Sequence, residues 1–140
     1  MTKENLDNLV RIGQLHAEPA NVKEFAGLVK SAQDRLQDVS NTPLTIASRF
    51  DLTYNAAHSL ALAALRWHGY RSDNRFQVFQ CLGHTLNVSS AEIQVFNLCH
   101  NQRNLAEYQG HLEIDEKLLV EFIQLTNDLM KRVNALAPIK

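Results

Sequence analysis

The sequence lacks several features that would place a chain of this size in a familiar class. Its two cysteines, Cys81 and Cys99, form no CxxC pair and no cluster with histidines, which argues against zinc or thioredoxin-like sites. Each lies in an apolar helical pattern, so we expect buried, reduced thiols. No apolar run reaches the length of a membrane-spanning helix. The first ten residues, MTKENLDNLV, are polar and charged, so we expect no signal peptide and a cytoplasmic protein.

Excess positive charge and strand-like patterns are also missing. The formal net charge is -1 and the pI is about 6.6, so any nucleic-acid site must be a local patch. No segment shows the alternating β-branched pattern of a half-buried strand. Hydrophobic residues make up 45% and charged residues 21% of the 140 residues, as in an ordinary globular protein. We therefore expect one domain over residues 1–140, with a core of its own.

Residues that start and stop helices divide the chain into segments. Two pairs have the spacing of a capping box, in which two side chains satisfy the free backbone N–H groups of a helix start: Asn21 with Glu24, and Ser89 with Glu92. Further start signals are Thr42 with Pro43, the SDN run before Arg75, and Asp115. Gly69 and Gly110 are natural stops. The predicted helices cover residues 3–15, 21–39, 44–68, 75–86, 89–108 and the segment after 115.

Apolar patterns in two of these helices predict the fold class. The stretch AAHSLALAALRW, in the helix over residues 44–68, is apolar around most of its circumference, as expected for the central helix of a bundle. The last helix has a wide apolar face made of Leu118, Leu119, Phe122, Ile123, Leu125, Leu129, Val133 and Leu136. We predict an all-α antiparallel bundle of four to five main helices plus a short N-terminal helix.

The stretch HNQRNLAEYQGH, residues 100–111, carries the most unusual residue. On a helical wheel, Arg103 lies about 20° from Phe96 and about 40° from Cys99. It therefore points into an apolar arc, and Glu107 and His100 are close enough along the helix to reach it. The members of this arc are Val95, Phe96, Leu98, Cys99, Leu105 and Ala106. The polar residues on the other side are Asn97, Asn101, Asn104 and Tyr108.

A guanidinium aimed at an apolar face needs acceptors, and two interpretations supply them. In one, Glu107 and a backbone carbonyl neutralise a structural arginine. In the other, Arg103 faces a cleft or a subunit interface and binds phosphate. Asp51, Asn55 and His58, with Tyr54 beside them, form a polar stripe on the central helix that is a candidate for the opposite wall. The alternatives are that this stripe faces solvent, or that His58 is an ordinary core histidine.

The segment RWHGYRSDNR, residues 66–75, has a second concentration of cations and aromatic rings. Its arginines and rings are Arg66, Arg71, Arg75, Trp67 and Tyr70. Such a mixture suits stacking on bases and contact with phosphates, which defines a candidate nucleic-acid patch. Alternatively, the rings close one end of the bundle while the arginines meet solvent or helix carbonyls. We favour this second, structural interpretation.

Two segments together resemble the HEPN superfamily, whose members are small helical domains linked to nucleotide and RNA chemistry. YNAAHSLALAALRWHGYR is similar to the long central helix of that family and the glycine-containing turn after it. RNLAEYQG is similar to its late-helix signature of an arginine, a polar residue and a tyrosine. The resemblance covers the chain from about residue 20 onward. It implies a homodimer in which arginine-bearing helices of both subunits line a shared cleft.

The resemblance is incomplete at a residue that matters for catalysis. Ribonucleolytic members have an arginine, four to six residues, and then a histidine, and here Tyr108, Gln109 and Gly110 fill the three histidine positions. His111 comes one residue too late, beyond the glycine stop. RNA cleavage without a metal needs a group that titrates near neutrality, and arginine cannot provide one. We therefore do not expect the nuclease activity to carry over.

These observations favour a HEPN-like dimeric module that binds a nucleotide or RNA without metal or cofactor. Relatives of this form also suggest a small nucleotidyltransferase as a partner, in a toxin–antitoxin pair. One alternative is a metal-independent ribonuclease that uses Arg103 with a displaced histidine, His111 or His100. Another is a plain helical protein–protein interaction domain. The candidate ligand-binding residues are Arg103, Asn104, Glu107, Tyr108, His100, His58, Asp51 and Asn55.

Overall fold

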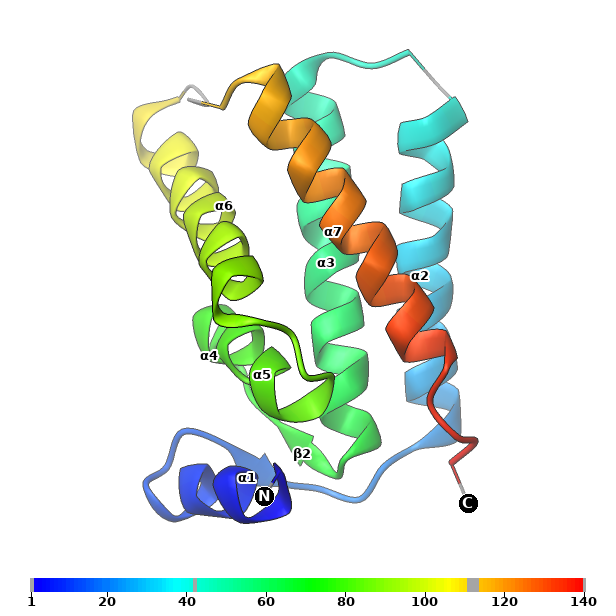
Figure 1. The fold of residues 1–140 in the computed structure, drawn as a ribbon, viewed down its shortest axis with the longest axis vertical. Helices are drawn as coiled ribbons and strands as arrows, with labels where there is room; N and C mark the ends of the chain where they lie inside the picture. The colour runs from blue at the N-terminus through cyan, green and yellow to red at the C-terminus, as the bar shows by residue number, and fades with distance from the viewer. Residues whose placement is uncertain (1, 42, 111–113, 140) are drawn as a thin grey trace.

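The computed structural model describes residues 2–41, 43–110 and 114–139, and these residues are mostly helical (Figure 1). Its elements in chain order are α1 (Thr2–Arg11), β1 (His16–Ala17), α2 (Val22–Asn41), α3 (Ile46–Trp67), β2 (Tyr70–Arg71), α4 (Arg75–Gln80), α5 (Leu82–Thr85), α6 (Ser90–Gln109) and α7 (Glu116–Asn134). The predicted helical bundle is thereby confirmed. The two-residue strands β1 and β2, which pair antiparallel, were not predicted.

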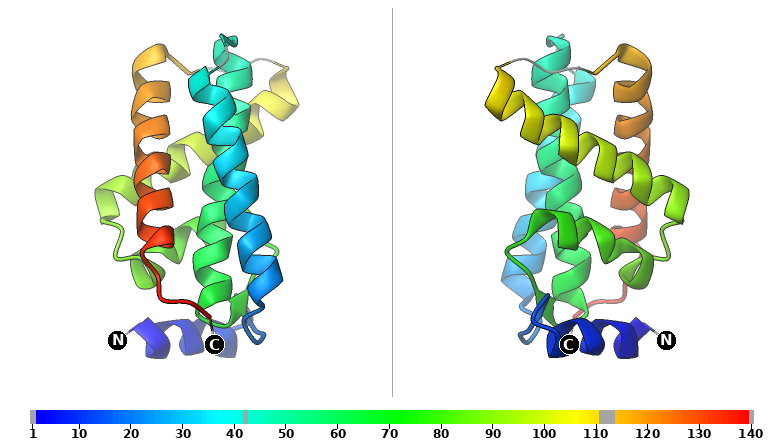
Figure 2. Two further views of the ribbon diagram at one scale, coloured as in Figure 1. Left: turned by 90° about the vertical axis from the view of Figure 1, so that its right-hand side faces the viewer. Right: turned by 90° about the vertical axis from the view of Figure 1, so that its left-hand side faces the viewer.

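The four long helices alternate in direction around a central α3. Figure 1 shows α2 and α6 running one way and α3 and α7 the other, with α3 between α2 and α6. In the side views of Figure 2, α6 crosses α3 obliquely, and Figure 1 shows that α7 is also inclined to α3. The α1 helix lies across one end of the bundle, near the β1–β2 pair. This arrangement leaves one side of α6 against α3 and the other side facing outward.

Side-chain caps explain where most helices begin. Asn21 Oδ1 accepts from the backbone N–H of Glu24 at 2.9 Å, as predicted. Ser89 and Glu92 form the complete predicted capping box at the start of α6. The prediction that Glu24 completes a capping box with Asn21 is wrong, because the Glu24 carboxylate binds Arg66 and Arg71 instead. Two charge-assisted hydrogen bonds to arginines are stronger than one to a neutral backbone N–H. The predicted starts at Asn74 and Asp115 are both confirmed.

The predicted limits of three helices are wrong, and the first of these helices ends at Arg11 and not at Leu15. The central helix begins at Ile46, with Thr45 as the cap accepting from Ser48 N–H at 3.2 Å, and not at Leu44. Thr42, the predicted cap, lies outside the described residues. The helix predicted over residues 75–86 is instead two short ones, α4 and α5, that meet at Cys81. Thr42 and Thr45 are equally good cap types, so sequence alone did not choose between them.

The core follows the face of α3 that the sequence indicated. Alanines such as Ala57, Ala61 and Ala64 are buried there, which allows neighbouring helices to approach closely. The large buried rings around them are Phe50, Tyr54, Phe79, Phe96 and Phe122. Cys81 and Cys99 are buried and free, and burial raises the pKa of Cys99 to about 12. Both thiols are therefore core residues, as predicted.

Candidate functional site

Tyr54 is the centre of a polar cluster enclosed by α3, α4 and α6. Its ring is buried, and its hydroxyl shares a hydrogen bond with His100 Nδ1 at 2.9 Å. The side-chain nitrogen of Asn104, one turn further along α6, lies 3.2 Å from His100 Nε2. Both ring nitrogens of His100 are thus engaged. The polar stripe of α3 and the Arg103 edge of α6 therefore do lie against each other.

Two arginines approach the Tyr54 ring from different helices. The Cζ atom of Arg103, on α6, lies 5.0 Å from the ring centroid, and that of Arg75, on α4, lies 5.6 Å from it. These are cation–π distances, and such contacts are favourable when the ring is desolvated. We call Tyr54, His58, Arg75, His100 and Arg103 the Tyr54 cluster.

The two guanidinium groups differ in how their charge is balanced. Arg103 Nη2 lies 3.0 Å from Glu107 Oε1, which is the predicted ion pair one helical turn away. Arg75 has no ion pair among the described residues. Its Nη1 atom is buried and has no hydrogen-bond partner there either. A buried guanidinium nitrogen without an acceptor is costly, and an anionic acceptor suits it best because it also balances the charge.

The two histidines of the cluster show the effect of this positive charge. Burial and the charges of Arg75, His100 and Arg103 lower the pKa of His58 to about 4. Burial, Arg103 and Arg75 also lower the pKa of His100 below its usual value. Both rings are therefore neutral at pH 7. An anion bound here would favour their protonated forms and add to the positive charge that holds it.

A pocket of about 370 Å³ opens beside Arg103, between the first turns of α3 and the last turns of α6. The residues that line it are Ala47, Phe50, Asp51, Arg103, Ala106, Glu107 and Gly110. Gly110 ends α6 in the left-handed conformation, with φ of 78°. The pocket therefore combines an apolar wall with one guanidinium and two carboxylates.

Some predicted ligand-binding residues do not face this site. Tyr108 is 90% exposed. The Asn55 amide donates to the backbone carbonyl of Asp51 at 2.9 Å, along its own helix. His111 lies outside the described residues. The site that the structure assembles thus contains Asp51, His58, His100, Arg103, Asn104 and Glu107 from the predicted set.

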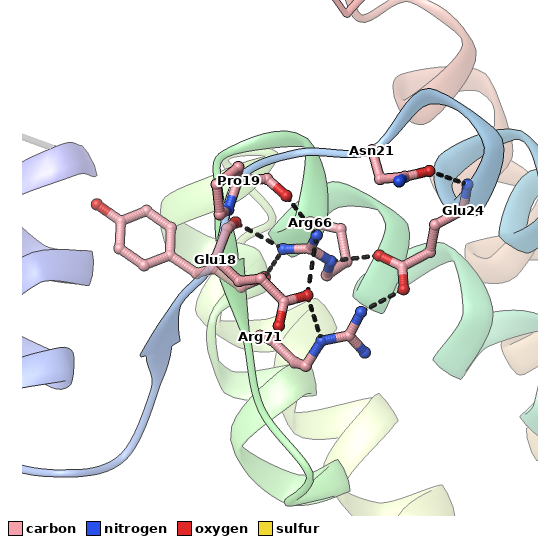
Figure 3. A network of polar contacts seen from close by, with 7 residues as sticks. Glu18, Pro19, Asn21, Glu24, Arg66 and Arg71 are labelled. Carbon is pink, nitrogen blue, oxygen red and sulfur yellow. Dashed lines mark hydrogen bonds and ion pairs between the residues drawn. The ribbon is translucent and has the colours of Figure 1, made fainter.

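Two arginines of the candidate nucleic-acid patch, Arg66 and Arg71, are in contrast already paired with acceptors of the protein. Arg66 is only 2% exposed and donates to the carbonyls of Glu18 at 2.8 Å and Pro19 at 2.7 Å, and its Nε to the Glu24 carboxylate (Figure 3). Arg71 binds both carboxylates as well, Glu18 at 2.9 Å and Glu24. Neither guanidinium is free for phosphate, so these two arginines are structural.

The aromatic residues of that segment also have structural partners. The Trp67 indole N–H donates to the carbonyl of Ala137 at 2.8 Å. Tyr70 is buried and its hydroxyl donates to Asp7 of α1. Burial and the Asp7 carboxylate raise the pKa of Tyr70 to about 12. Trp67 and Tyr70 therefore close one end of the bundle, in agreement with the second of the two interpretations given for residues 66–75.

Sequence reasoning placed Arg75 in the wrong group and left Tyr54 out of the site. Arg75 belongs to the Tyr54 cluster, not to a patch with Arg66 and Arg71. A signal for this was available, because Arg75 and Phe79 are four residues apart and so share one face of α4. Phe79 is a core residue that packs against Tyr54, with ring centroids 5.9 Å apart. The helical spacing thus directs Arg75 toward the same interior.

Two kinds of structural feature are absent from the described residues. Those residues contain no helix that is long and apolar enough to cross a membrane. They also contain no group of three or more histidine, cysteine, aspartate or glutamate side chains arranged to hold a metal ion.

Comparisons of the chain with protein-family models, with curated proteins and with solved structures gave no match.

Proposed function

We propose that this chain is a HEPN-like helical module that binds a phosphate group of a nucleotide or RNA at the Tyr54 cluster. The observation that carries the proposal is the buried, unpartnered Nη1 of Arg75 beside a second guanidinium, Arg103, over the same ring. Phosphate oxygens are acceptors that match arginine forks in geometry and charge. A bound phosphate would satisfy the buried nitrogen and balance the cluster's charge.

The resemblance to HEPN domains supports the same proposal from the sequence. The Arg103–Asn104 pair stands in the family's signature position, and Asn104 orients His100 through its ring nitrogen. His58 and His100 are both neutral imidazoles at pH 7. Each can take up a second ring proton when phosphate binds, so we expect affinity to rise as the pH falls from 7 toward 5.

Calorimetric titration with pyrophosphate and with nucleoside monophosphates tests the proposal. Arg75→Ala and Arg103→Ala should each weaken binding at least tenfold, since a charge-assisted hydrogen bond contributes roughly 1.5–3 kcal/mol. Arg35→Ala is the matched control, because Arg35 lies on α2 and its contacts are with Ser31. Circular dichroism of each variant checks that the fold is intact. Unchanged affinity in folded Arg75→Ala and Arg103→Ala proteins would rule the site out.

The ribonuclease alternative is tested in the same samples. Labelled tRNA and mRNA are incubated with the protein in EDTA, and cleavage is compared with Arg103→Ala and His100→Ala. We expect binding without cleavage, because Tyr108, Gln109 and Gly110 fill the positions where the ribonuclease motif has its histidine. Cleavage that both substitutions abolish would instead establish the enzyme.

We also propose that the module is a homodimer that associates through the outer face of α6. This face carries Gln94, Leu98, Asn101, Leu105 and Tyr108, spaced alternately four and three residues apart. Leu98 and Leu105 are each 44% exposed, although the wheel had placed both in the buried arc. Such spacing suits packing of one helix against a second copy, and no charge on the face opposes it.

The direction in which Arg103 points determines whether the two subunits of such a dimer would share one phosphate site. On α6, Arg103 lies about 140–180° from the residues of the outer face and points toward α3. Two copies joined through their outer faces therefore keep separate Tyr54 clusters. This differs from the shared cleft that the resemblance implies, and makes the phosphate site a property of each chain.

A further inference from the structure

Among the described residues, three aromatic rings lie around the His100 imidazole, and one of the three reaches solvent. Tyr54 and Phe79 are buried, and the centroid of each ring lies 6.1 Å from that of His100. Phe76, on the first turn of α4, lies 6.3 Å from His100 by the same measure, and it is 42% exposed. Phe76 is therefore the solvent side of the aromatic group that includes the Tyr54 cluster.

The position of the Phe76 ring distinguishes it from other exposed apolar side chains. Single exposed apolar residues are common on proteins, and Val120 on α7 is another in this chain. Phe76 differs because it directly follows Arg75, whose buried Nη1 lacks a partner within the residues that the structure describes. Consecutive residues of a helix point about 100° apart, so Arg75 approaches Tyr54 while Phe76 lies beside His100. A ligand held by Arg75 therefore has an aromatic surface next to it.

An aromatic ring beside a phosphate-binding arginine is a combination by which proteins hold unpaired bases. Every base has a flat π-face that stacks on an aromatic side chain, whichever hydrogen-bonding groups lie on its edge. Stacking requires an open ring face and no enclosing cavity, and the partly exposed Phe76 meets this requirement. The sugar of a nucleotide separates its base from its phosphate by about the distance between neighbouring rings of this aromatic group. One nucleotide can therefore reach both Arg75 and Phe76.

The presence of both an arginine and an aromatic ring favours one class of phosphate ligand over others. Inorganic phosphate, pyrophosphate and sugar phosphates can use the arginines alone, because none of them has a flat apolar face. A base inside a double helix is covered on both faces by its neighbours, so it must leave the helix before it can stack on a side chain. Free nucleotides and unpaired residues of RNA are the ligands that can use both groups.

We propose that Phe76 is the stacking surface for the base of a nucleotide whose phosphate binds at the Tyr54 cluster. This inference rests on the proposed phosphate site and adds a residue that determines its specificity. The nucleotide is either free or an unpaired residue of an RNA strand, since both offer the same base face and phosphate. Stacking does not read the edge of a base, so purines should bind more tightly than pyrimidines without selection of a single base.

Calorimetric titration of the full chain with AMP and with ribose 5-phosphate tests the inference, because ribose 5-phosphate is AMP without its base. AMP should bind about tenfold or more tightly, which is the order of magnitude for one stacked base. A short single strand of RNA with a terminal phosphate, compared with the same strand in a duplex, identifies the source of the nucleotide. Tighter binding of the single strand than of AMP supports an RNA ligand, and equal binding supports a free nucleotide. A duplex that binds as tightly as the single strand would contradict base stacking.

Substitutions of Phe76 separate stacking from packing. Phe76→Ala and Phe76→Leu should both lower the affinity for AMP to that for ribose 5-phosphate, and both should leave the binding of ribose 5-phosphate unchanged. Phe76→Tyr should keep the preference for AMP, because it keeps the ring. Leucine retains apolar contacts with the core, so Phe76→Leu gives the same test with little disturbance of the fold, which circular dichroism checks. Val120→Ala, at an apolar residue that is 50% exposed, is the matched control.

Further outcomes of these titrations would overturn the inference. Equal affinity of the wild type for AMP and ribose 5-phosphate would exclude base stacking and leave the phosphate site standing. A preference for AMP that folded Phe76→Leu retains would place the base elsewhere. If that variant also has a lower mass in sedimentation equilibrium, Phe76 belongs to a protein interface. Failure of AMP, ribose 5-phosphate and pyrophosphate all to bind would overturn the proposed function itself.

Discussion

At the scale of single residues, Arg66 is the clearest case of an arginine used for stability. Each of its three nitrogens has an acceptor, and the guanidinium ties residues 18–24 to the end of α3. Hydrogen bonds to Arg66 and Arg71 also lower the pKa of Glu24 below its usual 4.5. The Glu24 carboxylate therefore contributes to the free energy of unfolding above pH 4.5, and this contribution is lost as the pH falls through the lowered pKa.

Arg66→Met should destabilise the fold strongly, because it keeps the side-chain volume and leaves the Glu24 carboxylate and three backbone carbonyls, those of Glu18, Pro19 and Tyr70, without their donor. We expect a loss of about 3 kcal/mol in the free energy of unfolding, at the lower end for a broken buried ion pair since Glu24 partly reaches water. Arg71→Met, at a side chain that is 30% exposed, should cost at most about 1 kcal/mol. Urea unfolding at pH 7 measures both. Equal losses in the two variants would contradict a structural role specific to Arg66.

His58 should make stability depend on pH in a defined window. Its pKa is about 4 in the folded chain and 6.5 in the unfolded chain, so only the unfolded chain binds its proton between these values. Stability should therefore fall as the pH drops from 6.5 toward 4, by up to about 3 kcal/mol at roughly 1.4 kcal/mol per unit of pKa. Urea midpoints between pH 7 and 4 should vary less in His58→Gln than in the wild type. His16→Gln, at an exposed histidine, should leave the slope unchanged, and a steep slope retained in His58→Gln would contradict the assignment.

How far single residues could be predicted depended on how local their partners are. Arg103 was predicted to turn inward and meet Glu107, because both lie on one helix with known geometry. Arg66 meets Glu18 and Glu24, which are more than forty residues away along the chain. Helical spacing contains no information about such contacts. The apparent basic patch therefore looked the same in sequence whether its arginines were free or paired.

At the scale of elements, the capping residues in the sequence predicted most helix starts correctly. The prediction was ambiguous only where two possible capping residues lie close together. Asn21, Asn74, Ser89 and Asp115 all accept from the backbone three residues on, as their types predicted. The start of α3 was misplaced because the cap contact is made by Thr45, which the sequence analysis did not choose. Cap preferences are local and differ little between two threonines.

The α6 helix shows why an apolar wheel can mislead. Phe96 and Cys99 are buried against the bundle as predicted, but Leu98 and Leu105 face outward. Because α6 crosses α3 obliquely at the side of the bundle, only part of its circumference is covered (Figure 2). A wheel assigns residues to a common apolar side, and it does not show how wide a surface the neighbouring helices cover. That width is set by the crossing angle, which is a tertiary property.

At the scale of the whole molecule, the alternation of helix direction was predictable and the function was not. Short connections between long helices require antiparallel neighbours, and the described chain has this arrangement. A helical bundle is compatible with many activities, so the functional argument depends on the site. Here the argument comes from Arg75, whose buried Nη1 lacks a hydrogen-bond partner within the described ranges, and from Arg103 over the same Tyr54 ring.

The proposed dimer gives the last prediction at this scale. Leu98→Glu and Leu105→Glu should each convert a dimer into a monomer, because a negative charge at an isologous interface meets its symmetry copy and loses hydration. Val120→Glu on α7 is the matched control, since Val120 is 50% exposed and lies away from this face. Sedimentation equilibrium gives the mass of each protein. Both α6 variants should still bind phosphate, as each chain holds its own Tyr54 cluster. A wild-type monomer at high concentration would exclude the outer-face dimer, and loss of phosphate binding on dissociation would show that the two copies share the site.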